Sequence, residues 1–121
     1  SQKILKSIIG ISSIAGDRGK KKNNVYASAK SGFTSYLDGL RQRMYGQNIH
    51  VLTVKPGWVN TKMTKDVDLP KFMTVNADLV GNEIFDSHKL KRNTLYVPRY
   101  WGIIMLVYKM LPEFIFKFLA R

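Results

Sequence analysis

The sequence predicts an α/β fold in which three parallel strands are joined by crossover helices. Segments rich in β-branched apolar residues alternate with segments whose apolar residues recur at three- and four-residue spacing. The apolar segments show little alternation of polar and apolar residues, which is typical of strands buried on both faces. Parallel neighbours also require a crossover connection, and the connecting segments are long enough to supply helices.

The first strand is expected in residues 4–12, an Ile-rich segment that we predict to be buried. A glycine-containing loop follows and leads into the basic residues 20–22. An amphipathic helix is then predicted over residues 24–46. Its apolar positions at helical spacing are Tyr26, Ala29, Phe33, Tyr36, Leu37 and Leu40.

Residues 50–54 are β-branched with little alternation and residues 93–97 form a short segment, and each is closely followed by a proline, so we expect them to be the second and third strands. Between them, Thr74 or Asn76 can cap a second helix, after an irregular stretch in residues 60–73. The apolar positions of that helix are Leu79, Val80, Ile84 and Phe85.

Three parallel strands are a poor free-standing unit, because such sheets need helices on both faces and paired neighbours at their edges. We therefore expect residues 1–99 to be the C-terminal half of a larger α/β domain. The chain begins with Ser1 instead of Met, so truncation of an N-terminal half is expected. Residues 100–121 are predicted to form an amphipathic tail of two helices with a break at Pro112.

The composition excludes several classes of site. With no Cys among 121 residues, neither a disulfide framework nor a thiolate metal site can form. His50 and His88 lie 38 positions apart without a carboxylate cluster, so no metal site is expected. The longest apolar stretch, residues 101–108, is much shorter than the about 20 residues that span a bilayer. A cytoplasmic protein is expected, with contact to the cytoplasmic face of a membrane left open.

The net charge of +12 arises from 20 Lys and Arg against 8 Asp and Glu. Such a balance favours an anionic partner, which could be a substrate, a membrane surface or nucleic acid. The aromatic residues lie at helical core spacing and not on an exposed strand face, so nucleic acid is the least favoured of the three.

A pair of residues on the first helix indicates proton transfer. Tyr26 and Lys30 are four positions apart, so a phenol and an ammonium lie about 6 Å apart along one helix face. A nearby cation favours the phenolate form, which makes Tyr26 a candidate general acid and base. Ser13 follows the first strand, at the sheet edge where open parallel sheets place their ligands. Taken singly, Tyr26 is more simply a half-buried aromatic residue, Lys30 a solvated lysine and Ser13 a loop serine.

Three motifs in order resemble the short-chain dehydrogenase/reductase family, whose fold is a Rossmann-like parallel sheet. They are residues 11–16 (ISSIAG), 26–30 (YASAK) and 54–61 (VKPGWVNT). The resemblance implies that Ser13 hydrogen-bonds the substrate carbonyl or hydroxyl, Tyr26 transfers the proton and Lys30 holds the nicotinamide ribose. The cofactor, NAD or NADP, would be bound by Tyr26, Lys30, Pro56, Gly57, Val59 and Thr61. The family's glycine-rich phosphate loop is not in this chain, so the fragment is expected to be inactive alone, and the full-length protein to be a homo-oligomer.

The tail resembles the reductases that act on a decaprenylphosphoryl-2-keto-pentofuranose. This match is carried by residues 96–98, 104–107, 109 and 111–117, and by the loop at residues 16–19 with the basic residues that follow it. It implies a keto group on a polyprenyl-phosphate-linked pentose as substrate, a role in cell wall polysaccharide biosynthesis, and membrane contact through residues 101–121. Two alternatives remain open: a reductase of a soluble ketone or keto-acyl substrate, and a basic membrane-binding module without catalysis.

Overall fold

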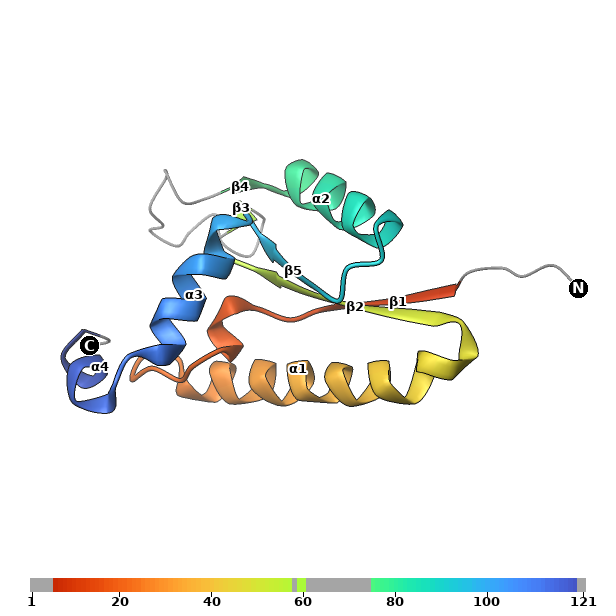
Figure 1. Ribbon diagram of the computed structural model, residues 1–121. Helices are drawn as coiled ribbons and strands as arrows, with labels where there is room; N and C mark the ends of the chain where they lie inside the picture. Colours follow the sequence, from red (N-terminus) through yellow and green to blue (C-terminus); the bar gives the residue numbers. More distant parts are fainter. Residues whose placement is uncertain (1–5, 58, 61–74, 120–121) are drawn as a thin grey trace, which may run out of the picture.

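The computed structural model describes residues 6–57, 59–60 and 75–119 (Figure 1). Its main sheet has three parallel strands in the order β1 (Lys6–Ile11), β2 (Ile49–Pro56) and β5 (Thr94–Val97). The helix α1 (Asn24–Met44) connects β1 to β2, and α2 (Ala77–Lys89) precedes β5. Figure 1 shows α1 along one face of this sheet and α2 over the other, so the predicted parallel α/β class is confirmed.

The core lies on the central strand, β2. It is bonded to strands on both sides and covered by helices on both faces, which explains why its sequence is apolar without alternation. Leu52 and Val54 are fully buried and form a cluster with Leu95 and Val97 of β5, on which Val80 and Ile84 of α2 pack. On the α1 side, Leu37 is buried and occupies the space beside Gly10, where an added Cβ would lie 3.0 Å from Leu37 Cγ.

The predicted burial of the first strand is wrong for this chain. Ile8, Ile9 and Ile11 of β1 are exposed, and Ile11 retains 53% of its accessible surface. The reason is the position of β1 at the edge of the sheet, where it pairs with β2 on one side only. The hydrophobic character of β1 is therefore that of an interior strand, whereas its environment is that of an edge.

Short elements join the main ones. A 3-10 turn, η1 (Ile14–Gly16), follows β1, and a second, η2 (Tyr45–Gln47), extends the end of α1. The two-residue strands β3 (Val59–Asn60) and β4 (Val75–Asn76) pair in parallel, which the sequence pattern did not predict. The helix α2 begins directly after Asn76, one of the two predicted capping positions.

The tail consists of α3 (Tyr100–Met110) and α4 (Glu113–Leu119), separated at Leu111 and Pro112. Leu111 has extended backbone angles, and the amide of Phe116 donates to Pro112 O at 2.9 Å at the start of α4. Trp101 and Met105 of α3 and Phe116 of α4 are buried, so part of the tail packs on the rest of the chain. Among the described residues, no helix has the length and apolarity needed to cross a bilayer.

Candidate active site

Ser13 lies where β1 ends and η1 begins. It is the N-cap of η1: its Oγ accepts a hydrogen bond from the amide of Ala15 at 3.0 Å, and its carbonyl accepts one from the amide of Gly16 at 3.1 Å. The side chain is largely buried, at 9% residue exposure. Because Oγ accepts from the backbone, the hydroxyl hydrogen of Ser13 is available to donate to a ligand.

The turn that carries Ser13 is pressed against α1 at Lys30. The hydroxyl of Ser12 donates to Lys30 O at 3.0 Å and lies 2.6 Å from the hydroxyl oxygen of Thr34. Gly16 approaches the same turn of the helix so closely that an added Cβ would lie 2.8 Å from both Lys30 C and Ser31 N. These contacts bring the end of β1 and one turn of α1 together, and they fix the position of Lys30 relative to Ser13.

Tyr26 and Lys30 lie one turn apart on α1, as their spacing predicts. Lys30 Nζ is 5.7 Å from the centroid of the Tyr26 ring and donates to Ile11 O, the last carbonyl of β1, at 3.4 Å. Tyr26 is 52% exposed, so about half of this residue is in contact with solvent. The structure therefore places the phenol, the ammonium and the carboxyl end of β1 next to one another.

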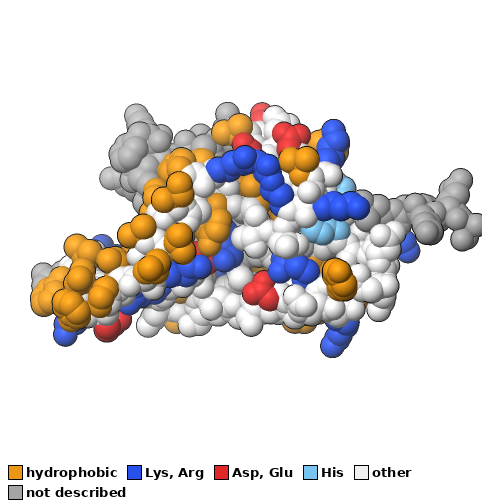
Figure 2. Space-filling view, in the orientation of Figure 1, with side chains coloured by type: hydrophobic (Ala, Val, Ile, Leu, Met, Phe, Trp, Pro, Cys, Tyr) orange, Lys and Arg blue, Asp and Glu red, His pale blue; other side chains and the backbone are white. Residues whose placement is uncertain are grey.

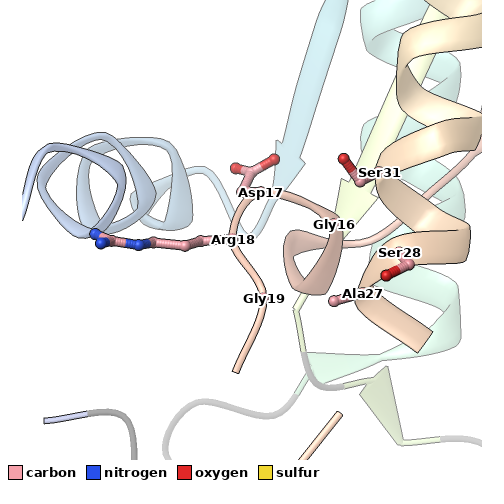
Figure 3. Close-up of a pocket in the computed structure, with 7 residues that line it drawn as sticks. All are labelled: Gly16, Asp17, Arg18, Gly19, Ala27, Ser28 and Ser31. Carbon is pink, nitrogen blue, oxygen red and sulfur yellow. The ribbon is translucent and has the colours of Figure 1, made fainter. Parts of the chain in front are cut away.

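Figure 3 shows a hollow on the neighbouring side of α1. It is formed between the loop after η1 and the first turns of the helix, and its lining residues are Gly16, Asp17, Arg18, Gly19, Ala27, Ser28 and Ser31. In this view, the side chain of Arg18 extends away from α1 toward the tail. The predicted catalytic residues Ser13, Tyr26 and Lys30 are not among its lining residues, because its walls come from the loop at residues 16–19 and from other positions of α1.

The residues predicted to hold the cofactor are described in part. Pro56 and Gly57 lie at the carboxyl end of β2, and the amide of Gly57 donates to Val97 O at 2.9 Å. Gly57 is required by packing, because an added Cβ would lie 2.7 Å from Cε2 of the buried Trp101. Val59 is in β3, but its side chain lies outside the described residues, as does Thr61.

A buried ionic cluster that the sequence analysis missed lies at the same edge of the sheet. Lys55 Nζ donates to Asp17 Oδ1 at 2.8 Å, and the Tyr96 hydroxyl donates to Asp17 Oδ2 at 2.5 Å. The side chains of Lys55 and Asp17 are only 10% and 3% exposed. Burial, followed by the hydrogen bond to Asp17 and its charge, raises the pKa of Tyr96, so this phenol remains a neutral donor. The cluster ties the loop after η1 to the ends of β2 and β5.

The sequence does contain a signal for this cluster. Lys55 continues an apolar strand, and a buried lysine needs a counterion. Residues 1–65 contain only two acidic residues, Asp17 and Asp38, and Asp38 belongs to the amphipathic helix. The other six acidic residues lie in residues 66–121, so the sequence indicates that Lys55 needs a carboxylate partner but does not identify which one.

Arg18 connects the same loop to the tail. Its guanidinium donates to Tyr108 O at 2.9 Å and to Leu111 O at 2.7 Å, two carbonyls at the end of α3. It also pairs with Glu113 at 3.0 Å and stacks 3.6 Å above the centroid of the Phe116 ring. One side chain thus holds the end of α3 and the start of α4 against the loop beside the candidate active site.

A parallel sheet with a helix on each face, with Lys30 beside Tyr26 and the end of β1, defines the class: part of a Rossmann-like α/β domain. Residues 5–71 match the short chain dehydrogenase family. The chain belongs to this family.

Two relatives in sequence are an oxidoreductase and a ketoacyl reductase. An uncharacterized oxidoreductase of Mycobacterium tuberculosis is 26% identical over 117 residues, which cover 95% of this chain and 46% of that protein. The ketoacyl reductase HetN of Nostoc sp. is 33% identical over 94 residues, covering 74% of this chain and 33% of the relative. This chain thus spans less than half the length of either protein.

Solved structures show the same fold. A short-chain dehydrogenase from Sphingobium yanoikuyae in complex with NADPH superposes with a TM-score of 0.70 at 18% identity, over 88% of this chain and 46% of the other. The 3-oxoacyl-[acyl-carrier protein] reductase of Brucella melitensis in complex with NAD has a TM-score of 0.52 at 31% identity, over 55% of this chain and 26% of the other.

Proposed function

We propose that this chain is the catalytic half of an NAD(P)-dependent oxidoreductase that interconverts a carbonyl and an alcohol. The observation that carries this proposal is the geometry around Lys30, whose ammonium lies beside the Tyr26 ring and donates to the last carbonyl of β1, close to Ser13. Membership of the short chain dehydrogenase family and the NAD- or NADP-bound relatives support it.

The residues of this chain fit the nicotinamide end of such a cofactor. Lys30 offers an ammonium beside Tyr26, and Pro56 and Gly57 end β2 at the same edge of the sheet. A dinucleotide also needs backbone amides at a helix N-terminus for its phosphates, and these 121 residues hold no glycine-rich loop that opens a helix. The bound cofactor would supply or accept the hydride.

Side chains of this chain would transfer the proton and stabilise the carbonyl oxygen of the substrate. In the reductive direction, negative charge develops on the carbonyl oxygen, where Tyr26 donates its hydroxyl proton and Ser13 donates a hydrogen bond. Ser13 is suited to this role because its Oγ already accepts from Ala15. The Lys30 ammonium lies beside the Tyr26 ring and is held there by its hydrogen bond to Ile11 O.

The unpaired edge of β1 supports the presence of an N-terminal half in the full-length enzyme. Its isoleucines are exposed and it pairs on one side only, which suits an interior strand whose other neighbour comes from elsewhere. We propose that an N-terminal half adds parallel strands there and provides the phosphate-binding loop. Residues 1–121 by themselves are then expected to lack turnover.

For the substrate, we propose a keto group on a polyprenyl-phosphate-linked pentose. The support is the resemblance of the tail and of the loop at residues 16–19, together with the Arg18 contacts that join these two segments. A keto-acyl substrate is the second candidate, favoured by the ketoacyl reductase and the 3-oxoacyl-[acyl-carrier-protein] reductases among the relatives.

The deciding experiment is Tyr26→Phe in the full-length gene product, assayed on both substrate classes. Loss of the proton donor should lower kcat by about 10²–10⁴-fold, while NAD(P)H binding, measured by fluorescence titration, stays unchanged. Tyr36→Phe removes a hydroxyl from a more exposed tyrosine of the same helix and should leave kcat intact. Full turnover by Tyr26→Phe would remove Tyr26 from the mechanism. Turnover of 3-oxoacyl thioesters alone would replace the lipid-linked substrate with the keto-acyl one.

A further inference from the structure

The tail presents a large apolar surface to solvent. The exposed apolar side chains of α3 and α4 include Ile103, Ile104, Leu106, Val107, Met110, Phe114, Ile115, Phe118 and Leu119. Figure 2 shows hydrophobic side chains gathered over this end of the molecule. Met110 and Phe114, on either side of the break, are 73% and 66% exposed. A contiguous apolar surface of this kind marks an interaction site.

The charges around this surface are cationic. Asp17 and Glu113, the acidic residues described at this end, are already paired with Lys55 and Arg18. Lys109 and Lys117 form no ion pair with any residue that the structure describes, and neither do the lysines at positions 20–22. Lys20 follows Arg18 by two residues, a chain reach of about 7 Å from the residue that binds the α3–α4 junction. The apolar surface is thus accompanied by unpaired positive charge.

We propose that the α3–α4 surface docks on an anionic lipid surface. Short helices that expose apolar side chains beside lysines bury the former at the acyl boundary and place the latter among anionic headgroups. The helices are too short and interrupted to span a bilayer, which agrees with binding at its surface. A protein partner would need an acidic surface of matching shape, whereas an anionic membrane satisfies both the charge and the apolar area at once.

Through Arg18, docking of the tail would also position the loop beside the candidate active site. It binds the carbonyls of Tyr108 and Leu111 while its neighbour Asp17 is held by Lys55 and Tyr96. The lipid-binding helices are therefore attached to the loop that lines the hollow of Figure 3. Docking would bring that hollow close to the headgroup layer. The docking itself does not depend on the reaction proposed above, since its residues are separate from the candidate catalytic ones.

The test is co-sedimentation of the full-length gene product with vesicles. Vesicles of mixed phosphatidylcholine and phosphatidylglycerol should bind the protein at least about tenfold more tightly than phosphatidylcholine vesicles, and added salt should weaken the binding. The double variant Met110→Ser/Phe114→Ser should lose roughly tenfold or more in partitioning. The double variant Lys109→Gln/Lys117→Gln should lose a similar factor on anionic vesicles only.

Matched controls lie elsewhere on the surface. Tyr36→Ser/Tyr45→Ser removes apolar side chains that are 63% and 88% exposed, and Lys6→Gln/Arg43→Gln removes two charges near the opposite end of the sheet. Both controls should bind vesicles like the wild type.

Equal binding to the two vesicle types, or an unchanged affinity in both tail variants, overturns the proposal. So does a tail variant that alters only the oligomeric state in sedimentation without vesicles. Turnover of a water-soluble ketone should persist in the tail variants, which separates this test from that of Tyr26.

Discussion

At the scale of single residues, Lys55 and Asp17 form a buried ion pair in which each charge depends on the other. Each charge has lost most of its contact with water, and only the partner and the Tyr96 hydroxyl compensate for that loss among the described residues. Removing one charge leaves the other buried and unpaired, which costs far more than the intact pair contributes.

We therefore expect Asp17→Ala to lower the free energy of unfolding by about 3–5 kcal/mol. The double variant Asp17→Ala/Lys55→Met should recover part of this loss, because it removes the unpaired ammonium. Asp38→Ala, which breaks an exposed pair with Arg41, should cost less than about 1 kcal/mol. Urea unfolding of the full-length gene product measures all three. Equal losses for Asp17→Ala and Asp38→Ala would contradict the buried pair.

A second residue couples stability to pH. His50 Nε2 lies 2.6 Å from Arg92 O, and as an N–H it donates to that carbonyl. Burial, followed by the positive charges of Arg41, His88 and Lys91, lowers the pKa of His50 below its usual 6.5. The folded protein therefore takes up this proton at lower pH than the unfolded chain does, so stability is intact above 6.5 and falls as the pH drops toward the folded-state pKa.

Between about pH 7.5 and about pH 5, the Tm of the wild type should decrease, and His50→Gln should show a smaller decrease. The glutamine amide can still donate to Arg92 O but does not titrate in this range. Calorimetric melting at both pH values checks the difference. The same pH slope in both proteins would show that other groups, such as carboxylates, account for the acid sensitivity.

At the scale of elements, packing against α1 sets the position of the turn that carries Ser13. Gly16 lies against the helix backbone, which cannot move aside as a flexible side chain could. Gly32 lies in the same helix, and an added Cβ there meets no other described atom within 4 Å. The two glycines form a matched pair with opposite expected effects.

Gly16→Ala should lower the free energy of unfolding by about 1–3 kcal/mol, because the added methyl group overpacks the contact. It should also lower kcat in the full-length gene product, since the contact positions Ser13 relative to Lys30. Gly32→Ala should stabilise the protein by up to about 1 kcal/mol through its higher helix propensity. Chemical denaturation and steady-state kinetics measure both effects, and a Gly16→Ala variant as stable and active as the wild type would rule out the tight contact.

The elements themselves were largely predictable. Periodicity places the end of α1 within two residues of its observed position, and the apolar segments at residues 50–54 and 93–97 correspond to β2 and β5. The strands β3 and β4 were missed because two residues carry no periodic pattern. In the candidate site, the Tyr26–Lys30 neighbourhood follows from helical spacing, whereas the contact between Tyr96 and Asp17 joins residues 79 positions apart.

At the scale of the whole molecule, the chain exposes two apolar surfaces of different kinds. The isoleucines of β1 belong to a strand with one open edge, which suits continuation of the sheet by a further strand. The side chains of α3 and α4 lie on helices beside unpaired lysines, which suits an anionic surface. The Arg18 contacts place the second surface next to the candidate active site.

The sequence by itself determined the α/β class, the order of its main elements and the local pairing of Tyr26 with Lys30, because these depend on residues that are close along the chain. Only the tertiary structure decided that β1 is exposed, that Asp17 neutralises Lys55 and that Arg18 attaches the tail to the site loop. Burial and charge compensation are set by neighbours that the fold brings together from distant positions, and a local pattern does not specify which neighbours those are.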